Sequence, residues 1–353
     1  MPFRAFHLAP LLGCLALAGC GAASADVHRD PSPAQLAQTA PLGTTKVSFE
    51  DQTRHRPLVT RLWYPAAPKT ASTITALDWI FVARAVPEAP MATQPEKLPL
   101  LLLSHGTGGS MSSLAWIGEH LAAHGYLVAA VEHAGNAYGD DTPEGAIAQW
   151  RRPLDLSRTL DALLADSRFA PRIDANRVGA VGMSSGGYTV IAVAGGLYHP
   201  ERMGEHCQKQ PSRRGCRPDA RAILESLPDR DAASSSYKDP RFRAVFALAP
   251  ALGPGFAAED LADIKIPVGI VASAQDEWVP LADNAGHYAA LIPGAELTVL
   301  PKGGHFTFLS LCNELGRDRA RDICIDIDPT VDRAAVHEQV GKLVLDFFDA
   351  HLR

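Results

Sequence analysis

The feature that most constrains the fold is the Gly-x-Ser-x-Gly motif of residues 182–186, which joins an apolar run to a helix-prone segment. In the order strand, sharp turn and helix, this motif forms a nucleophile elbow that exposes its serine at the carboxyl edge of a sheet. Ser184 is therefore the candidate nucleophile, and the backbone N–H of Ser185 is a candidate oxyanion donor. The alternative is a small-residue turn with a surface serine, because the bare motif also arises by chance.

A second glycine-rich turn follows the apolar run 98–104 and reads His105-Gly106-Thr107-Gly108-Gly109. An unbroken apolar run is typical of a strand buried on both faces of a parallel sheet. Glycines in the turn let backbone N–H groups point into a cavity, so the N–H of Thr107 is a second candidate oxyanion donor. A phosphate loop would require a Gly-Lys-Ser/Thr ending, which is absent here. His105 is expected to be a structural hydrogen-bonding residue.

Two further residues complete a possible nucleophile–base–acid set. Asp276 follows the apolar run 267–272, and His305 follows the run 296–300 within a Gly-Gly turn. A serine hydroxyl is a weak nucleophile unless a histidine takes its proton, and that histidine needs a carboxylate to fix its tautomer. The sequence therefore predicts Ser184, His305 and Asp276 as catalytic residues, with Glu277 and Asp283 as the alternative acids.

Several segments resemble the platelet-activating-factor acetylhydrolase family and its dienelactone-hydrolase-like bacterial relatives. The similar segments are 54–58, 62–66, 103–106, 121–133 and 304–312, and the likeness covers roughly residues 41–353. The resemblance implies an α/β-hydrolase fold, with a mostly parallel central sheet, helices on both faces and a small cap-like insertion. It also implies a serine carboxylic-ester hydrolase that uses neither metal nor cofactor.

This sequence departs from the family pattern at two positions. Met183 stands where many relatives have histidine, and Ser184 replaces the cysteine of dienelactone hydrolases proper. An acyl ester (short-chain, lipid-like or acetyl) is therefore expected as substrate rather than dienelactone. An amidase or peptidase with the same triad, or a catalytically silent binding lipoprotein of the same fold, are the alternatives. A net charge of −6 without a basic stripe argues against nucleic acid as a partner, and the oligomeric state stays open.

The first twenty residues have the pattern of an export signal. Arg4 precedes an apolar run over residues 8–18, and Leu17-Ala18-Gly19-Cys20 resembles the lipobox of bacterial lipoproteins. The resemblance implies cleavage before Cys20, lipidation of Cys20 and a membrane-anchored protein that faces the periplasm or the cell exterior. An ordinary secretory peptide cleaved near Ala25 is the alternative. Residues 21–40 are expected to be a flexible tether, which leaves 41–353 as the catalytic domain.

Four cysteines follow the tether, and an oxidising compartment favours disulfides between them. Of the three possible pairings, we expect Cys207–Cys216 and Cys312–Cys324, because each pair brackets one short polar insertion. Free thiols or a zinc site are the alternatives, although no His/Cys spacing resembles a zinc site. Segment 197–240, which contains the first pair, is expected to be a cap or lid, or else a solvated surface excursion.

Overall fold

A computed structural model describes residues 41–353, except 69, 71–74 and 77–78. The expected signal at 1–20, the tether at 21–40 and the lipidation site Cys20 lie outside the described residues. All described residues belong to one compact unit, Gln38–Arg353. Within these residues no helix combines the length and the apolar character that a membrane crossing needs.

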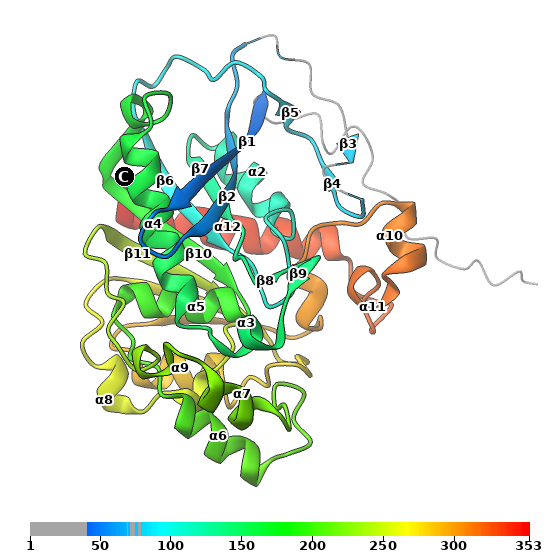
Figure 1. Ribbon diagram of the computed structural model, residues 1–353. Coiled ribbons are helices and arrows are strands. Elements are labelled where there is room, and N and C mark those ends of the chain that lie inside the picture. Colours follow the sequence, from blue (N-terminus) through cyan, green and yellow to red (C-terminus); the bar gives the residue numbers. More distant parts are fainter. Residues whose placement is uncertain (1–40, 69, 71–74, 77–78) are drawn as a thin grey trace, which may run out of the picture. The chain divides into compact units, whose positions relative to one another are not determined.

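A nine-stranded sheet runs through the described residues in the order β13-β12-β11-β10-β6-β7-β2-β1-β5 (Figure 1). Neighbouring strands from β7 to β13 are parallel, whereas β2 is antiparallel to both β7 and β1. The strands of this sheet are β1 (Leu42–Asp51), β2 (Arg56–Pro65), β5 (Val86–Pro87), β6 (Leu98–Ser104), β7 (Leu127–Val131), β10 (Ile173–Met183), β11 (Phe242–Leu248), β12 (Val268–Ser273) and β13 (Glu296–Leu300). The expected mostly parallel sheet is thus confirmed, and an antiparallel hairpin of β1 and β2 lies near one of its edges.

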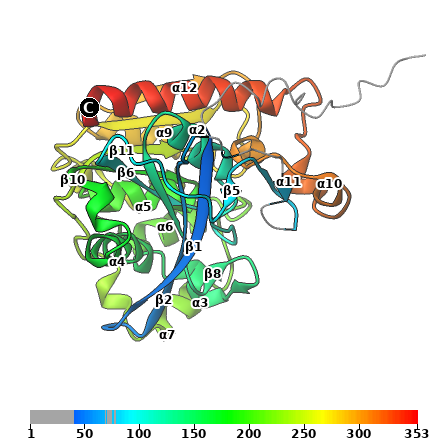
Figure 2. The same cartoon turned by 90° about the horizontal axis from the view of Figure 1, so that it is seen from above.

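Helices cover both faces of the sheet, as Figure 2 shows for α12 and α2 on one side and α4 and α5 on the other. The α-helices are α2 (Ala115–Ala123), α3 (Pro143–Ile147), α4 (Arg151–Ala165), α5 (Ser185–Ala194), α6 (Pro200–Lys209), α7 (Ala220–Ser226), α8 (Ala258–Leu261), α9 (Ala285–Leu291), α10 (Glu314–Arg319), α11 (Arg321–Cys324) and α12 (Arg333–Leu352).

The leucines of β6 explain why this strand lies in the middle of the sheet. Side chains alternate across a strand, so Leu98, Leu100 and Leu102 pack into the core that contains α4, α5 and α9. Leu101 and Leu103 point the other way, into the core with α2 and α12. A strand that is apolar on both faces is stable only when both are covered, and the whole of β6 is buried.

Segment 135–150, which lacks any helical or strand pattern in the sequence, is more ordered than its polarity suggests. It holds the short pair β8 (Asn136–Ala137) and β9 (Asp140–Asp141), followed by α3. Thr142 explains the start of α3, because its hydroxyl caps the helix by accepting from the N–H of Gly145 at 2.9 Å. A second short pair, β3 (Thr75–Ala76) with β4 (Val82–Ala83), lies apart from the main sheet.

The two polar insertions are closed by disulfides Cys207–Cys216 and Cys312–Cys324, which is the pairing expected from the sequence. Segment 197–240 is not a bare surface loop, because it contains α6 and α7. It also has a small core of its own, in which Leu227 and Ala233 pack against Ala148 and Trp150.

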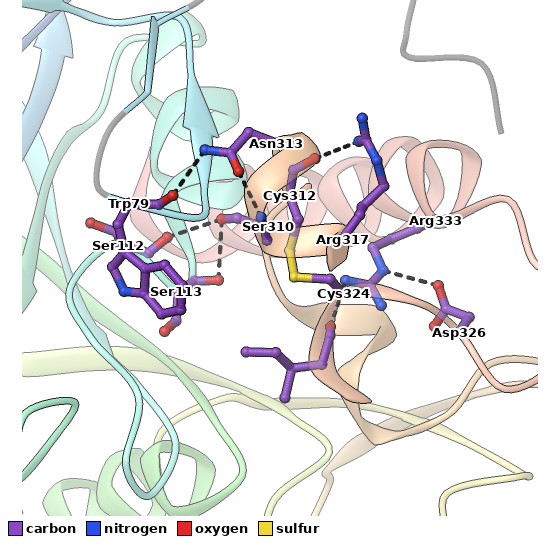
Figure 3. The surroundings of a disulfide bond; sticks show 12 residues. Trp79, Ser112, Ser113, Ser310, Cys312, Asn313, Arg317, Cys324, Asp326 and Arg333 are labelled. Atoms are coloured by element: carbon purple, nitrogen blue, oxygen red, sulfur yellow. Dashed lines mark hydrogen bonds and ion pairs between the residues drawn. A yellow bond between two sulfur atoms is a disulfide. The ribbon is translucent and has the colours of Figure 1, made fainter. Parts of the chain in front are cut away.

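The second disulfide closes a loop within the segment after β13, and this loop lies next to Trp79 (Figure 3). Next to it, the side-chain amide of Asn313 donates to the carbonyl of Trp79 at 3.0 Å. The hydroxyl of Ser310 donates a shared hydrogen bond to the carbonyls of Ser112 and Ser113, both at 3.1 Å. The insertion therefore fastens two segments that are far apart in the sequence.

Candidate active site

The elbow lies where β10 ends and α5 begins. Ser184 has φ +58° and ψ −120°, a backbone conformation that only a tightly held turn imposes on a residue with a side chain. The neighbouring glycines make this turn possible. A Cβ on Gly182 would collide with the carbonyl of Gly186, and a Cβ on Gly186 would collide with the carbonyl of Ser104. The motif thus holds Ser184 between β10, α5 and the end of β6.

His305 lies between Ser184 and Asp276, so the structure brings together the three residues predicted as a catalytic set. His305 Nε2 is 3.0 Å from Ser184 Oγ, and His305 Nδ1 is 2.7 Å from Asp276 Oδ2. Since a carboxylate can only accept, Nδ1–H donates to Asp276 and Nε2 is left to accept the hydroxyl proton of Ser184. This arrangement can raise the nucleophilicity of a serine hydroxyl.

The surroundings of Asp276 distinguish it from the two neighbouring acids. Its other carboxylate oxygen, Oδ1, accepts from the backbone N–H groups of Trp278 and Val279, each at 2.9 Å, so the side chain has one fixed direction. Glu277 instead faces Arg214 at 3.7 Å, and Asp283 faces Arg213 at 3.2 Å. Both alternatives therefore contact the Cys207–Cys216 loop and leave the position beside His305 to Asp276.

The loop that carries His305 is held from behind by Thr307. Gly303 has φ +103°, which favours glycine, and the next residue, Gly304, donates its N–H to the Thr307 hydroxyl at 2.9 Å. Thr307 in turn donates to Asp326, whose other oxygen accepts from Arg333 Nε at 2.9 Å. The base is therefore fixed to the start of α12.

The two candidate oxyanion donors are residues on different elements. Thr107 lies in the turn after β6, and Ser185 is the first residue of α5. Their hydroxyls are 2.7 Å apart, which joins the two elements directly. Neither backbone N–H has an acceptor among the described residues, so both are free to bind an oxygen of a ligand.

A second Ser–His–Asp series lies under this site. Ser104 Oγ is 2.9 Å from His133 Nε2, and His133 Nδ1 is 2.9 Å from Asp155 Oδ2. All three side chains are inaccessible to solvent, so no substrate can reach them. Burial, followed by the charge of Arg152, lowers the pKa of His133 to about 3. The neutral imidazole therefore serves as a structural link between β6 and α4.

His105 lies beside this series, in the structural role expected from the sequence. Its ring is buried, and Nδ1 lies 2.7 Å from the carbonyl oxygen of Gly106. Nε2 lies 3.2 Å from the backbone N–H of His133 and accepts from it. Burial is the main cause that holds the pKa of His105 well below its usual range, so the ring is neutral and Nδ1–H donates to Gly106.

Sequence reasoning missed the charged residues that support the site. Arg152 is buried and donates to the carbonyl of His105, next to Thr107, and to the hydroxyl of Thr189. Thr189 is uncharged but also fully buried, and its hydroxyl donates to the carbonyl of Ser185. Although burial alone would raise the pKa of Asp155, hydrogen bonds from His133 and Arg56 hold it well below its usual range. A sequence signal did exist: Arg152 and Asp155 are three apart, so they share a helix face with the buried Leu156 and Thr159.

Exposed aromatic side chains lie around the site. Among the described residues, the exposed aromatics are Trp79, Tyr138 and Trp278. The ring of Trp278 stacks against that of His305, with 6.5 Å between centroids, and the Arg214 guanidinium lies 4.9 Å above its centroid. The N–H of Tyr138 donates to the carbonyl of Gly109 in the oxyanion turn, and its ring is 5.5 Å from that of Trp79. Exposed apolar groups gathered around a site favour an apolar ligand.

Comparison with known proteins gives independent evidence on the family of this chain. Residues 100–314 match the model of the alpha/beta hydrolase family, and this range contains Thr107, Ser184, Asp276 and His305. The chain is similar to cutinase est2 of Thermobifida alba, with 34% identity over 27% of this chain and 29% of the relative. It is also similar to the platelet-activating factor acetylhydrolase of Cavia porcellus, with 31% identity over 27% of this chain and 31% of that protein.

A solved structure is similar over a much longer part of the chain. The ferulic acid esterase from Streptomyces cinnamoneus superposes with a TM-score of 0.61 and 25% sequence identity, covering 90% of this chain and 92% of that one. The two curated relatives, in contrast, are matched over less than a third of their own length.

Proposed function

Because the chain belongs to the alpha/beta hydrolase family, we propose that it hydrolyses carboxylic esters through an acyl-enzyme formed on Ser184. The observation that carries the proposal is the position of His305, hydrogen-bonded to Ser184 at 3.0 Å and to Asp276 at 2.7 Å. The proposed catalytic domain comprises residues 41–353. Three relatives named as a cutinase, an acetylhydrolase and a ferulic acid esterase support ester bonds as the target.

In the first half of the reaction, Ser184 Oγ attacks the ester carbonyl while His305 Nε2 takes the hydroxyl proton. Asp276 stabilises the imidazolium that forms. The carbonyl oxygen becomes an oxyanion and is bound by the N–H groups of Thr107 and Ser185. The C–O bond to the alcohol then breaks, His305 gives its proton to the departing alcohol, and the acyl group stays on Ser184.

In the second half, water replaces the alcohol. His305 takes a proton from the water as it attacks the acyl-serine carbonyl, and the same two N–H groups bind the second oxyanion. The bond to Ser184 then breaks, and His305 returns the proton to Ser184 Oγ. The acid leaves, and the original hydrogen bonds form again. No residue outside this set has to move a proton.

The proposed substrates are acyl esters with an apolar or aromatic part. Short-chain, lipid-like and acetyl esters agree with the names of the relatives, and the ring of Trp278 beside His305 supports an aromatic group as well. An aromatic group of a substrate that contacts the exposed part of this ring buries apolar area.

Comparing p-nitrophenyl acetate, octanoate and cinnamate with peptide p-nitroanilides tests the proposal. We expect turnover of the esters and little turnover of the anilides, since an amine leaving group needs stronger protonation. Preference for the anilides would replace the proposal with an amidase. No turnover of either class would contradict it and favour a silent binding protein.

We also propose that the protein is exported and anchored by lipid on Cys20. The disulfides Cys207–Cys216 and Cys312–Cys324 support export, because such bonds persist in oxidising compartments. The lipobox-like sequence supports the anchor. Intact mass of protein extracted from membranes should correspond to a chain that begins at an acylated Cys20. An unmodified N-terminus beyond Cys20 would contradict the anchor.

A further inference from the structure

One buried side chain contacts both elements that carry the candidate oxyanion donors. Arg152, the second residue of α4, is 1% exposed. Its Nη2 donates to the carbonyl of His105 at the end of β6, and its Nε donates to the hydroxyl of Thr189 on α5 at 3.2 Å. Its Nη1 donates to the side chain of Asn136. The guanidinium therefore spans the gap between the turn with Thr107 and the helix with Ser185.

The contact with His105 bears on the direction of the Thr107 N–H. This N–H and the carbonyl of Gly106 belong to the same peptide group, so fixing one fixes the other. The Gly106 carbonyl accepts from His105 Nδ1 at 2.7 Å and from the N–H of Gly109 at 3.1 Å. Arg152 holds the carbonyl of the histidine that makes the first of these bonds.

The contact with Thr189 bears on Ser185. The Thr189 hydroxyl accepts from Arg152 and donates its own proton to the carbonyl of Ser185 at 2.8 Å. The hydroxyls of Ser185 and Thr107, 2.7 Å apart, close the series into a ring. Both donor residues are thus connected through hydrogen bonds to the Arg152 guanidinium.

Burial of the charged Arg152 side chain costs free energy, which indicates a role beyond packing. Among the described residues, no carboxylate lies within ion-pair distance of its guanidinium, and all three acceptors are neutral oxygens. Burial lowers the pKa of Arg152 to about 9. The charge of Asp155, which lies beyond ion-pair distance, opposes this shift only in part. A buried cation without a direct ion pair is expensive, and an apolar side chain of similar size would fill the space at lower cost.

We propose that Arg152 is a positioning residue for the oxyanion site, acting on Thr107 through His105 and on Ser185 through Thr189. Its charge also stabilises the negative oxygen that forms on attack by Ser184, because a fixed cation in a dry interior acts on developing charge without reorganising. The inference rests on the proposed ester hydrolysis. It predicts that weakening this ring impairs transition-state binding more than substrate binding.

The test uses four variants, of which two perturb the ring and two are matched controls. Arg152→Lys keeps the charge but loses the planar fork, and Thr189→Val removes the linking hydroxyl at constant shape. Thr189→Ser retains that hydroxyl. Thr159→Val makes the same substitution at another fully buried threonine, on α4, whose hydroxyl has no partner among the described residues. Each variant is assayed for kcat, KM, melting temperature and inhibition by a trifluoromethyl ketone, whose adduct with serine carries an oxyanion.

For Arg152→Lys and Thr189→Val, we expect kcat/KM to fall by about 10- to 100-fold with KM nearly unchanged, since small displacements of catalytic groups cost up to about 10²-fold. The inhibition constant of the ketone should rise by the same factor. Thr189→Ser and Thr159→Val should keep wild-type values for both. An unchanged inhibition constant in the first two variants, or an equal loss in Thr159→Val, would overturn the inference while ester hydrolysis stands. A wild-type protein that hydrolyses no ester would overturn the proposed function, and this inference with it.

Discussion

Replacement of Ser184 by alanine is expected to lower kcat/KM for p-nitrophenyl esters by about 10⁴- to 10⁶-fold, the usual loss when a triad nucleophile is removed. Without Oγ no acyl-enzyme forms, and His305 has no hydroxyl proton to take. The fold should survive, because the elbow depends on Gly182 and Gly186 rather than on the hydroxyl. Turnover and thermal unfolding of the purified variant measure the two effects separately.

Ser104→Ala is the matched control for this prediction. Ser104 also hydrogen-bonds to a histidine that contacts an aspartate, but it is fully buried. We expect Ser104→Ala to retain most of its turnover and to lose some thermal stability. Near-complete loss in Ser104→Ala together with retained turnover in Ser184→Ala would contradict the choice of nucleophile.

Replacement of Asp276 by asparagine is expected to lower kcat by about 10⁴-fold, with little change in KM. The amide removes the charge that stabilises the imidazolium. It can also present an N–H to His305 Nδ1, which would move the imidazole proton to Nε2 and leave no acceptor for Ser184. Steady-state kinetics on a short ester measure the loss, and the melting temperature reports on folding.

Glu277→Gln and Asp283→Asn are the controls, because these acids contact the Cys207–Cys216 loop instead of His305. Both should retain turnover of a small ester. A loss near 10⁴-fold in either control, with an active Asp276→Asn, would show that the acid had been assigned wrongly.

Much of the fold and the position of the candidate site could be predicted from local sequence. The leucines of β6 demand cover on both faces, and this led correctly to a parallel sheet between two helical layers. The Gly-x-Ser-x-Gly turn and the two glycines before His305 have local geometric causes that a sequence displays directly. The disulfide pairing could be predicted in the same way, because each cysteine pair brackets one short insertion.

The supporting network could not be predicted in the same way. Arg152 contacts His105, which is 47 positions earlier in the chain, and Thr189, which is 37 positions later. Such contacts depend on how α4 packs beneath the sheet, and no pattern within one segment reports this. The short pair β8 and β9 was missed for a related reason, because strands of two residues are too short to show a period.

The central claim, a nucleophilic Ser184 activated by His305, is tested most directly by mapping a covalent adduct. The wild-type protein is treated with a fluorophosphonate, and its intact mass and its peptides are then measured. The account predicts one adduct per chain, on Ser184, which is absent from Ser184→Ala and greatly slowed in Asp276→Asn. An adduct on another serine of the folded protein, or no adduct under conditions that label a known serine esterase, would contradict it.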